Sequence, residues 1–413
     1  MRNSIESILT RGVSIGSKFL LLGYLAKILT LEDYGSFQLI SYFIFISTMI
    51  FGLEYYNISN RQLAENPSQK SVFNEHLNFF ITLSPIVFAL QIVIVFTILP
   101  KQLLTLKNIV FVLAISIFDY FSQEVYRYLM ISKEYRSGNI QLIYKSSIFL
   151  ILIIAYAIIF NSLNFNNILL LMLISYLLLF LLATLSFSKK IYNFQIKHLK
   201  FLSFLELKKK INVLWPFIVL ALFIKGIEFS DKFIIGKKIG LEAAGIYSFV
   251  FSMASIINVF IVSGFYIIYL PQLINSFRTD HKKFKKELIK FGVYTIGFSL
   301  LLGAGVIFGS GFVFEIIGKT EFLDHLELLY ILVAGFILYN ISLIPHLFLY
   351  VCHAERAITL VMGLAFFLNL FLNFLLVNKF DILGSAYSFL ATYIVILIFK
   401  SIWAYFKWRK LIA

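Results

Sequence analysis

Residues 214–257 form an apolar helix that carries four charged residues and then, after a Gly-rich corner, a second apolar helix. On a helix that turns about 100° per residue the four charged residues fall within an arc of about 120°, so they share one face; they are Lys225, Glu228, Asp231 and Lys232. Cations on such a face can bind an anionic group, and carboxylates can carry a proton or Na⁺. A charge at mid-membrane costs about 2.5–3.5 kcal/mol on insertion scales, so this face needs a polar interior rather than lipid.

The elements that must position these charges are membrane-spanning helices. Of the 413 residues, 60% are hydrophobic and only 14% are charged, which lies outside the range of soluble globular proteins. Apolar stretches of about 20 residues recur, and a helix of that length crosses the hydrocarbon core of about 30 Å. We therefore predict an all-α integral membrane protein with about 12 transmembrane helices. The expected spans are 12–30, 37–57, 77–99, 109–130, 140–160, 166–187, 213–235, 243–270, 288–309, 326–351, 357–377 and 383–406.

The longest polar break separates the sixth span from the seventh. We predict an N-terminal six-helix half over residues 1–187, a cytoplasmic basic linker over 188–210 and a C-terminal six-helix half over 211–413, with the two halves around a central cavity. A short repeat supports two related halves, since LEDYGSFQ begins at Leu31 and LEAAGIYSF at Leu241. Six spans in each half give both copies the same orientation, related by an axis along the membrane normal.

Basic residues are unevenly shared between the two sets of loops. With the N-terminus inside, the inner loops and tails hold 24 Lys and Arg and the outer loops hold 6. This bias predicts that both termini are cytoplasmic. The net charge of +15 therefore reports membrane topology and not nucleic-acid binding. The basic segments 188–210 and 275–290 are either solvated loops or contacts to anionic membrane lipids.

The candidate functional residues are the charges within the spans. Basic side chains are predicted to line a water-accessible cavity and meet an anionic head group; they are Lys18, Arg127, Lys225 and Lys232. The carboxylates available to carry a coupling ion or to form ion pairs are Asp119, Glu124, Glu228 and Asp231.

Structural roles compete with this interpretation. Glu228 and Lys232 are four residues apart, and Glu124 and Arg127 are three apart, so each pair can neutralise itself for packing. Lys232 also lies near the end of its span, where snorkelling to the interface is another explanation.

Small and amide residues predict contacts between helices. Gly305 and Gly309, in GAGVIFGSG, lie four apart and indicate a face for close helix packing. Asn369 and Asn373, one turn apart in the eleventh span, favour hydrogen bonds across helices over contact with a sugar.

No enzyme site emerges from the sequence. There is no Walker A segment or HExxH pair, and the six His lie in loops or at span ends. We predict no enzymatic activity and no bound cofactor, with energy supplied by an H⁺ or Na⁺ gradient or by downstream consumption of the substrate.

Four stretches together resemble polysaccharide flippases of the multidrug/oligosaccharidyl-lipid/polysaccharide exporter superfamily. They are EFSDKFIIGKKIGLEAAGIYSFVFSMASI, LAKILTLEDYGSFQLISYF, YLPQL and LNLFLNFLLVNKFDILGSAYSFLATY. The resemblance implies a bacterial inner-membrane protein that moves undecaprenyl-diphosphate-linked oligosaccharide repeat units, such as O-antigen or capsule units, to the periplasmic leaflet by alternating access. Asp231 and Lys232 correspond to a family pair that often carries Arg in second place, and Lys lacks its bidentate fork.

Other activities stay open at this stage. A drug/cation antiporter of the same superfamily would favour carboxylates in its cavity, whereas the span charges here are six basic and five acidic. A glycan polymerase or glycosyltransferase would need a large loop with catalytic residues, which the sequence lacks. A lipid scramblase also stays open, as does docking to a polysaccharide polymerase.

Overall fold

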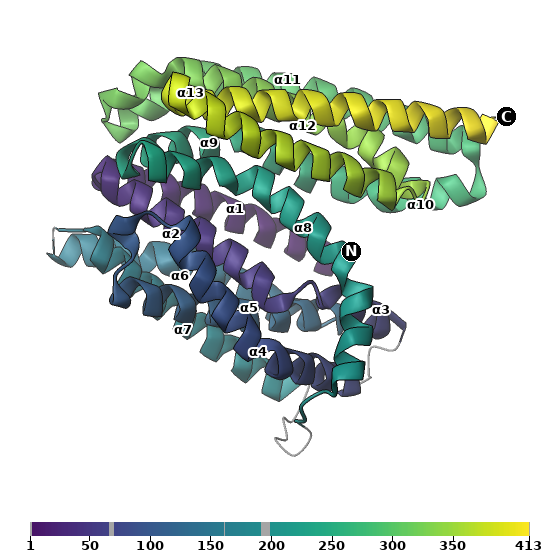
Figure 1. Ribbon diagram of the computed structural model, residues 1–413, viewed down its shortest axis with the longest axis horizontal. Coiled ribbons are helices and arrows are strands. Elements are labelled where there is room, and N and C mark those ends of the chain that lie inside the picture. Colours follow the sequence, from purple (N-terminus) through teal and green to yellow (C-terminus); the bar gives the residue numbers. More distant parts are fainter. Residues whose placement is uncertain (1, 66–69, 161, 191–198, 413) are drawn as a thin grey trace. The chain divides into compact units, whose positions relative to one another are not determined.

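The computed structural model describes residues 2–65, 70–160, 162–190 and 199–412, and these form helices without any strand. The chain divides into two compact units, Met1–Val219 and Leu220–Ala413 (Figure 1). Ten of the described helices are long and apolar enough to cross a membrane. The expectation of an all-α membrane fold is thus confirmed.

The first unit is a bundle of long helices joined by short connections. Helix α5 packs against α2, α6 and α7, while α1 packs against α6. The elements are α1 (Arg2–Ile28), α2 (Leu31–Gly52), α3 (Tyr56–Glu65), α4 (Lys70–Ile98), η1 (Lys101–Leu103), α5 (Leu106–Ile131), α6 (Tyr135–Phe160), α7 (Phe165–Lys190) and the first part of α8 (Phe204–Lys238).

The second unit holds the rest of α8 and is centred on α12, which packs against α9, α11 and α13. Its further elements are α9 (Leu241–Ile261), the π-helical turn η3 (Val262–Tyr266), α10 (Ile267–Thr279), α11 (His281–Ile317), η4 (Thr320–His325), α12 (Leu326–Val351) and α13 (Glu355–Ile412). Phe380 and Asp381 leave helical geometry and divide α13 into two helices. With those two counted separately and α1 included, the described part of the chain contains twelve helices of 18 residues or more.

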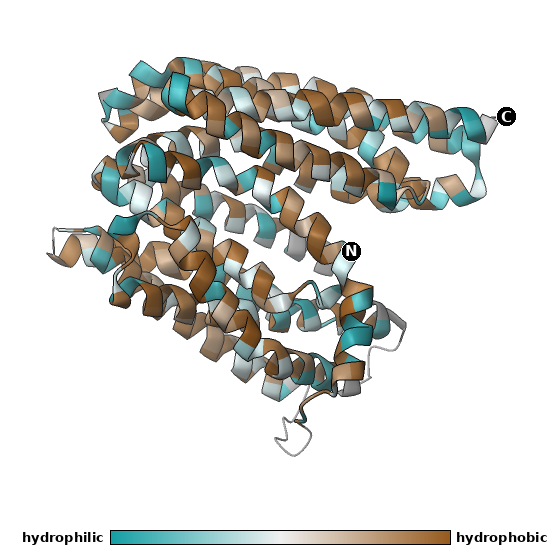
Figure 2. Cartoon of the chain, in the orientation of Figure 1, coloured by the Kyte–Doolittle hydropathy of each residue, from teal (hydrophilic) through white to brown (hydrophobic). Residues whose placement is uncertain are grey.

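Apolar side chains face outward and polar side chains face inward on the first part of α13. The exposed stripe repeats every three or four residues, with 60–63% of each side chain accessible: Leu360, Leu364, Phe367, Phe371 and Phe374. Asn369 and Asn373 are buried on the opposite face, where Asn369 donates to Thr392 at 3.1 Å and Asn373 accepts from Ser385 at 2.7 Å. This pattern suits a helix in lipid, and it confirms that the two amides join helices. Hydrophobic residues dominate the ribbon of both units (Figure 2).

Local capping fixes where the helices begin. Ser203 and Glu206 form a capping box, with the Ser203 N–H donating to the Glu206 carboxylate at 2.8 Å, so α8 starts within the stretch predicted as a linker. Residues 191–198 of that linker lie outside the described residues. Asp280 caps α11, and hydrogen bonds from the backbone N–H groups of Lys283 and Lys282 hold the pKa of its carboxyl below the usual value.

The predicted close packing at Gly305 and Gly309 is wrong. A Cβ added at either residue would meet no atom within 4 Å, because both point away from neighbouring helices. Close approaches occur instead at other glycines: a Cβ at Gly303 of the same motif would lie 3.0 Å from the Ile337 side chain, and one at Gly384, just after the interruption of α13, would lie 2.3 Å from the backbone of Leu376. The sequence spacing identified small residues but could not identify which of them face a neighbour.

Gly384→Ala should therefore destabilise the protein, whereas Gly309→Ala should not. The added methyl group at position 384 has to displace backbone atoms, and overpacking of this kind costs about 1–3 kcal/mol or more. At position 309 the methyl group has open space, and alanine favours a helix by up to about 1 kcal/mol over glycine. Thermal unfolding of the two purified variants in one detergent tests this, and equal midpoints would contradict it.

Candidate functional site

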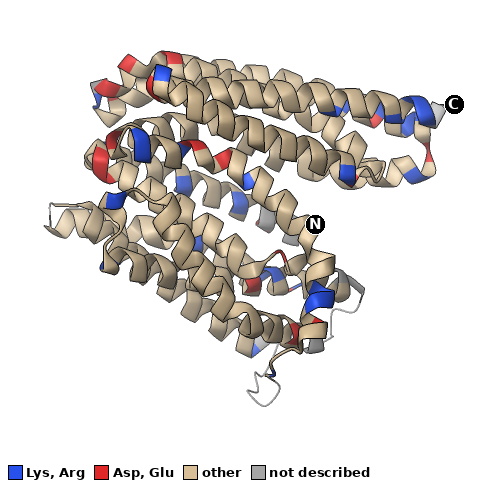
Figure 3. Ribbon diagram, in the orientation of Figure 1, with Lys and Arg blue, Asp and Glu red and all other residues tan. Residues whose placement is uncertain are grey.

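Four of the charges on α8 form two groups in the second unit. Lys225 and Glu228 pair at 2.6 Å, and 27% and 40% of their side chains are exposed. One turn further along α8, Asp231 and Lys232 have 1% and 0% of their side chains exposed. The four residues that share a face in sequence thus divide into an accessible pair and a buried pair. Figure 3 shows that most charged residues of the second unit lie near the ends of its helices.

The buried pair is fully hydrogen-bonded. The Lys232 ammonium donates to both Asp231 oxygens at 2.9 and 3.1 Å and to the Glu228 backbone carbonyl at 2.6 Å, and it lies 3.3 Å from the centre of the Phe251 ring. Tyr247 of α9 donates its hydroxyl to Asp231 at 2.6 Å. This network joins α8 to α9 and leaves the Lys232 ammonium without access to solvent. Lys232 therefore does not snorkel to the interface in this conformation.

The Leu-Glu repeat pairs the residues of this network with apolar residues in the first unit. Leu31 and Leu241 begin α2 and α9, and the two Gly residues of the repeat, Gly35 and Gly245, are buried in both. At the same spacing, Asp231, Lys232 and Tyr247 correspond to three buried residues of the first unit: Leu21, Leu22 and Phe37. The same helix junction is thus built with a charged pair in one unit and with hydrocarbon in the other.

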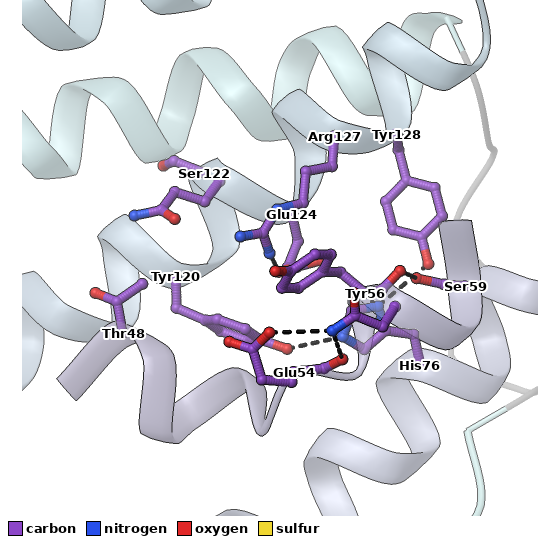
Figure 4. Close-up of polar contacts among 12 residues, drawn as sticks. Thr48, Glu54, Tyr56, Ser59, His76, Tyr120, Ser122, Glu124, Arg127 and Tyr128 are labelled. Carbon is purple, nitrogen blue, oxygen red and sulfur yellow. Dashed lines mark hydrogen bonds and ion pairs between the residues drawn. The ribbon is translucent and has the colours of Figure 1, made fainter. Parts of the chain in front are cut away.

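The first unit carries its own polar cluster where α2 ends (Figure 4). Glu124 and Arg127 of α5 form an ion pair, as their spacing predicted. The guanidinium of Arg127 lies 3.9 Å from the centre of the Tyr56 ring, and 30% of its side chain is exposed. Burial, followed by the nearby Glu54 carboxylate, raises the pKa of Tyr56 to about 12, so this phenol stays neutral at physiological pH.

His76 of α4 is buried beside that pair. One ring nitrogen lies 2.9 Å from the Tyr120 hydroxyl and the other 3.2 Å from the Tyr128 hydroxyl. The second nitrogen is also 3.7 Å from Glu124 Oε2. The sequence places His76 at a loop or span end, and nothing in it indicates that Tyr55, Tyr120 and Tyr128 would enclose the ring.

The cluster depends on an abrupt end of α2. Leu53 and Glu54 both have positive φ, 42° and 58°, which turns the chain into α3. Asn57 then donates to the Glu54 carboxylate at 3.0 Å. The adjacent Tyr55 is fully buried and accepts a hydrogen bond from Lys210 of α8 at 2.9 Å.

Asp119 lies in a separate network of the first unit. It forms an ion pair with Lys145 of α6, accepts from Gln123 at 2.9 Å and from Thr48 of α2 at 3.4 Å. The sequence alone does not pair Asp119 with Lys145, because the two residues are on different helices. Lys18 lies on an exposed face of α1. Among the residues that the structure describes, no three His, Cys, Asp or Glu gather in a group that could hold a metal ion.

The repeat supplies a test of what the buried pair does. Lys232→Leu alone should cost about 3–5 kcal/mol of stability, because the Asp231 charge stays buried without its partner. The triple variant D231L/K232L/Y247F copies the residues of the first unit and should be near wild-type stability, since apolar replacement of a whole buried pair is often neutral. Thermal unfolding and expression level report both effects. A triple variant as unstable as the single one would mean that the junction requires the charges.

Comparison with known proteins places this geometry in a family. Residues 1–271 match the family model of polysaccharide biosynthesis proteins. No curated protein sequence matches the chain. A solved multidrug resistance MATE family transporter of the MOP superfamily aligns with a TM-score of 0.71 and 10% identity, over 96% of this chain and 95% of that one. The lipid II flippase MurJ aligns with a TM-score of 0.71 and 16% identity, over 96% and 86%. The fold is therefore that of MATE and MurJ transporters, and the chain belongs to the polysaccharide biosynthesis protein family.

Proposed function

We propose that the protein is a flippase that moves undecaprenyl-diphosphate-linked oligosaccharide repeat units from the cytoplasmic to the periplasmic leaflet of a bacterial inner membrane. The observation that carries this proposal is the match of residues 1–271 to polysaccharide biosynthesis proteins in a chain that shares its fold with a lipid II flippase. Alternating access between inward-open and outward-open states would move the head group. A polysaccharide polymerase would consume the units that arrive.

The cargo sets the chemistry that the protein must offer. A diphosphate needs cations, a sugar needs a polar surface, and a polyprenyl tail can stay in lipid. Arg127 and Lys225 suit the diphosphate, since each is partly exposed and each is held in place by a carboxylate one turn away. We retain the exposed Lys18 in this set and assign the buried Lys232 to the junction of α8 with α9.

The proposed orientation follows from the basic residues. The inner loops and tails hold 24 Lys and Arg, and the outer loops hold 6. This bias predicts that both termini lie in the cytoplasm. Arg127 lies one turn before the end of α5 at Ile131, which in this orientation is the cytoplasmic end of the span. It would then be placed to meet a diphosphate in the cytoplasmic leaflet.

Ion-coupled export of a cationic drug is the second candidate. The MATE transporter matches the fold with the same TM-score as the flippase, and the Glu228 carboxylate is 40% exposed beside Lys225. A carboxylate accessible from solvent is the group that a cationic substrate would require. The two candidates therefore differ in the sign of the charge that binds.

Reconstituted vesicles can separate these functions. Wild-type protein should move a fluorescent undecaprenyl-diphosphate-linked oligosaccharide between leaflets, measured as the fraction that an external quencher cannot reach. Arg127→Gln and Lys225→Gln should each slow this movement about tenfold or more, because one charge-assisted hydrogen bond contributes about 1.5–3 kcal/mol. Lys107→Gln is the matched control, since Lys107 is an exposed lysine at the start of α5 that contacts Asn166 at 3.4 Å.

Two outcomes would count against the flippase. Movement no faster than in protein-free vesicles, together with uptake of a cationic dye, would favour the antiporter. Normal movement by Lys18→Gln, Arg127→Gln and Lys225→Gln at equal protein levels would show that these cations do not handle the cargo.

A further inference from the structure

Among the described side chains, the polar cluster at the end of α2 contains three carboxylates and two cations. Among the side chains that the structure describes there, Glu54, Glu75 and Glu124 face only Arg127 and Lys210. Lys210 pairs with Glu75 at 3.0 Å, and Arg127 pairs with Glu124. An uncompensated negative charge next to apolar surface is costly, and binding one proton would remove it.

Glu124 is the carboxylate with the strongest reason to take that proton. Only 7% of its side chain is exposed, against 44% for Glu75, so water solvates its charge least. Its Oε1 meets Arg127, whereas its Oε2 is buried and accepts no hydrogen bond from any described residue. A buried oxygen of this kind either destabilises the fold or is satisfied when a ligand or a proton binds to it.

His76 can accept a hydrogen bond from a protonated Glu124. Neutral imidazole has one donor and one acceptor nitrogen, and Tyr120 and Tyr128 can satisfy one each. The nitrogen on the Tyr128 side is 3.7 Å from Glu124 Oε2, so as the acceptor nitrogen it can, after a small shift, take a hydrogen bond from a protonated Glu124 in place of the one from Tyr128. The other titratable or charged groups around this site are Glu54, Tyr55, Tyr56, Glu75, Arg127 and Lys210.

We propose that Glu124 is a proton-binding site that controls whether Arg127 is available to an anion. A proton from water binds to Oε2, the carboxyl becomes neutral and the ion pair with Arg127 loses its charge attraction. The guanidinium keeps its cation–π contact with Tyr56 and turns its donors to a diphosphate. This inference rests on the proposed function, because it names the group of that cargo which Arg127 would bind.

The linkage has a definite sign. If protonation of Glu124 favours anion binding, anion binding must favour protonation of Glu124 by the same free energy. Undecaprenyl diphosphate should therefore bind with uptake of a proton, and its affinity should fall as pH rises. For one linked proton the limit is about tenfold per pH unit. If the substrate instead displaced a proton, binding would release that proton and the affinity would rise with pH.

Infrared difference spectroscopy on the detergent-solubilised protein tests the proton site without any cargo. On acidification, wild type should gain a carboxylic-acid carbonyl band that Glu124→Gln lacks. Glu75→Gln is the matched control and should keep the band, because Glu75 belongs to the same cluster but is partly exposed and paired with Lys210. A band that persists in Glu124→Gln would overturn the site.

Calorimetry with undecaprenyl diphosphate in buffers of different ionisation enthalpy tests the linkage. Wild type should take up about one proton more than Glu124→Gln, because the diphosphate's own titration is common to both. Glu124→Gln should bind across the pH range as tightly as wild type does in acid, and Arg127→Gln should lose binding while keeping the infrared band. Proton release, or equal uptake by wild type and Glu124→Gln, would overturn the linkage.

These readouts separate the inference from the proposed function. Movement of the glycan by a wild type whose binding shows no proton uptake would overturn the inference and leave the flippase intact. A Glu124 band in a protein that does not bind undecaprenyl diphosphate would refute the role of Arg127 in cargo binding.

Discussion

A charge on a membrane-spanning helix must find its counter-charge or hydrogen bonds inside its own bundle, because lipid offers neither water nor ions. Asp119 meets Lys145, Glu124 meets Arg127, and Asp231 meets Lys232. Two of these pairs are on a single helix, and the third joins α5 to α6. The polar residues therefore influence which faces of the helices turn inward, while the exposed Leu and Phe of α13 show the outward face that lipid would cover.

The two units solve the same packing problem in different ways. The repeat gives each unit a helix that begins with Leu-Glu, and the compared residues are two from the preceding helix and one from this helix. In the first unit those residues are hydrocarbon; in the second they are a Lys, an Asp and a Tyr whose polar atoms all have partners. Since a buried ion pair seldom adds stability over an apolar equivalent, stability alone gives little reason for the second unit to have acquired charges. At this junction, therefore, the two units differ by a buried charged pair whose polar atoms all have partners.

Periodicity and length were enough to predict most of the fold. The apolar stretches gave the helices, and spacing within one helix gave the Glu124–Arg127 pair. Spacing paired Glu228 with Lys232, but the carboxylate of Glu228 meets Lys225 and only its backbone carbonyl meets Lys232. The partners of Lys145 and His76 could not be predicted because they are on other helices, and a single sequence contains no signal for which faces meet. The same lack of information explains the error at Gly305 and Gly309, since a small residue permits close packing without specifying a neighbour.

The site in the first unit exists because its backbone breaks where the second unit continues. Two consecutive residues in left-handed geometry, Leu53 and Glu54, cost about 1–2 kcal/mol each. At the corresponding point of the repeat, α9 passes through a π-helical turn directly into α10. If α2 continued in the same way, Glu54, Tyr55 and Tyr56 would leave the surroundings of Glu124 and Arg127. Strain that persists in one unit and is absent from its repeat has to be offset by the contacts it creates, here the burial of Tyr55 and the hydrogen bonds of Asn57. The break is thus the feature that places Glu54, Tyr55 and Tyr56 around the Glu124–Arg127 pair of α5.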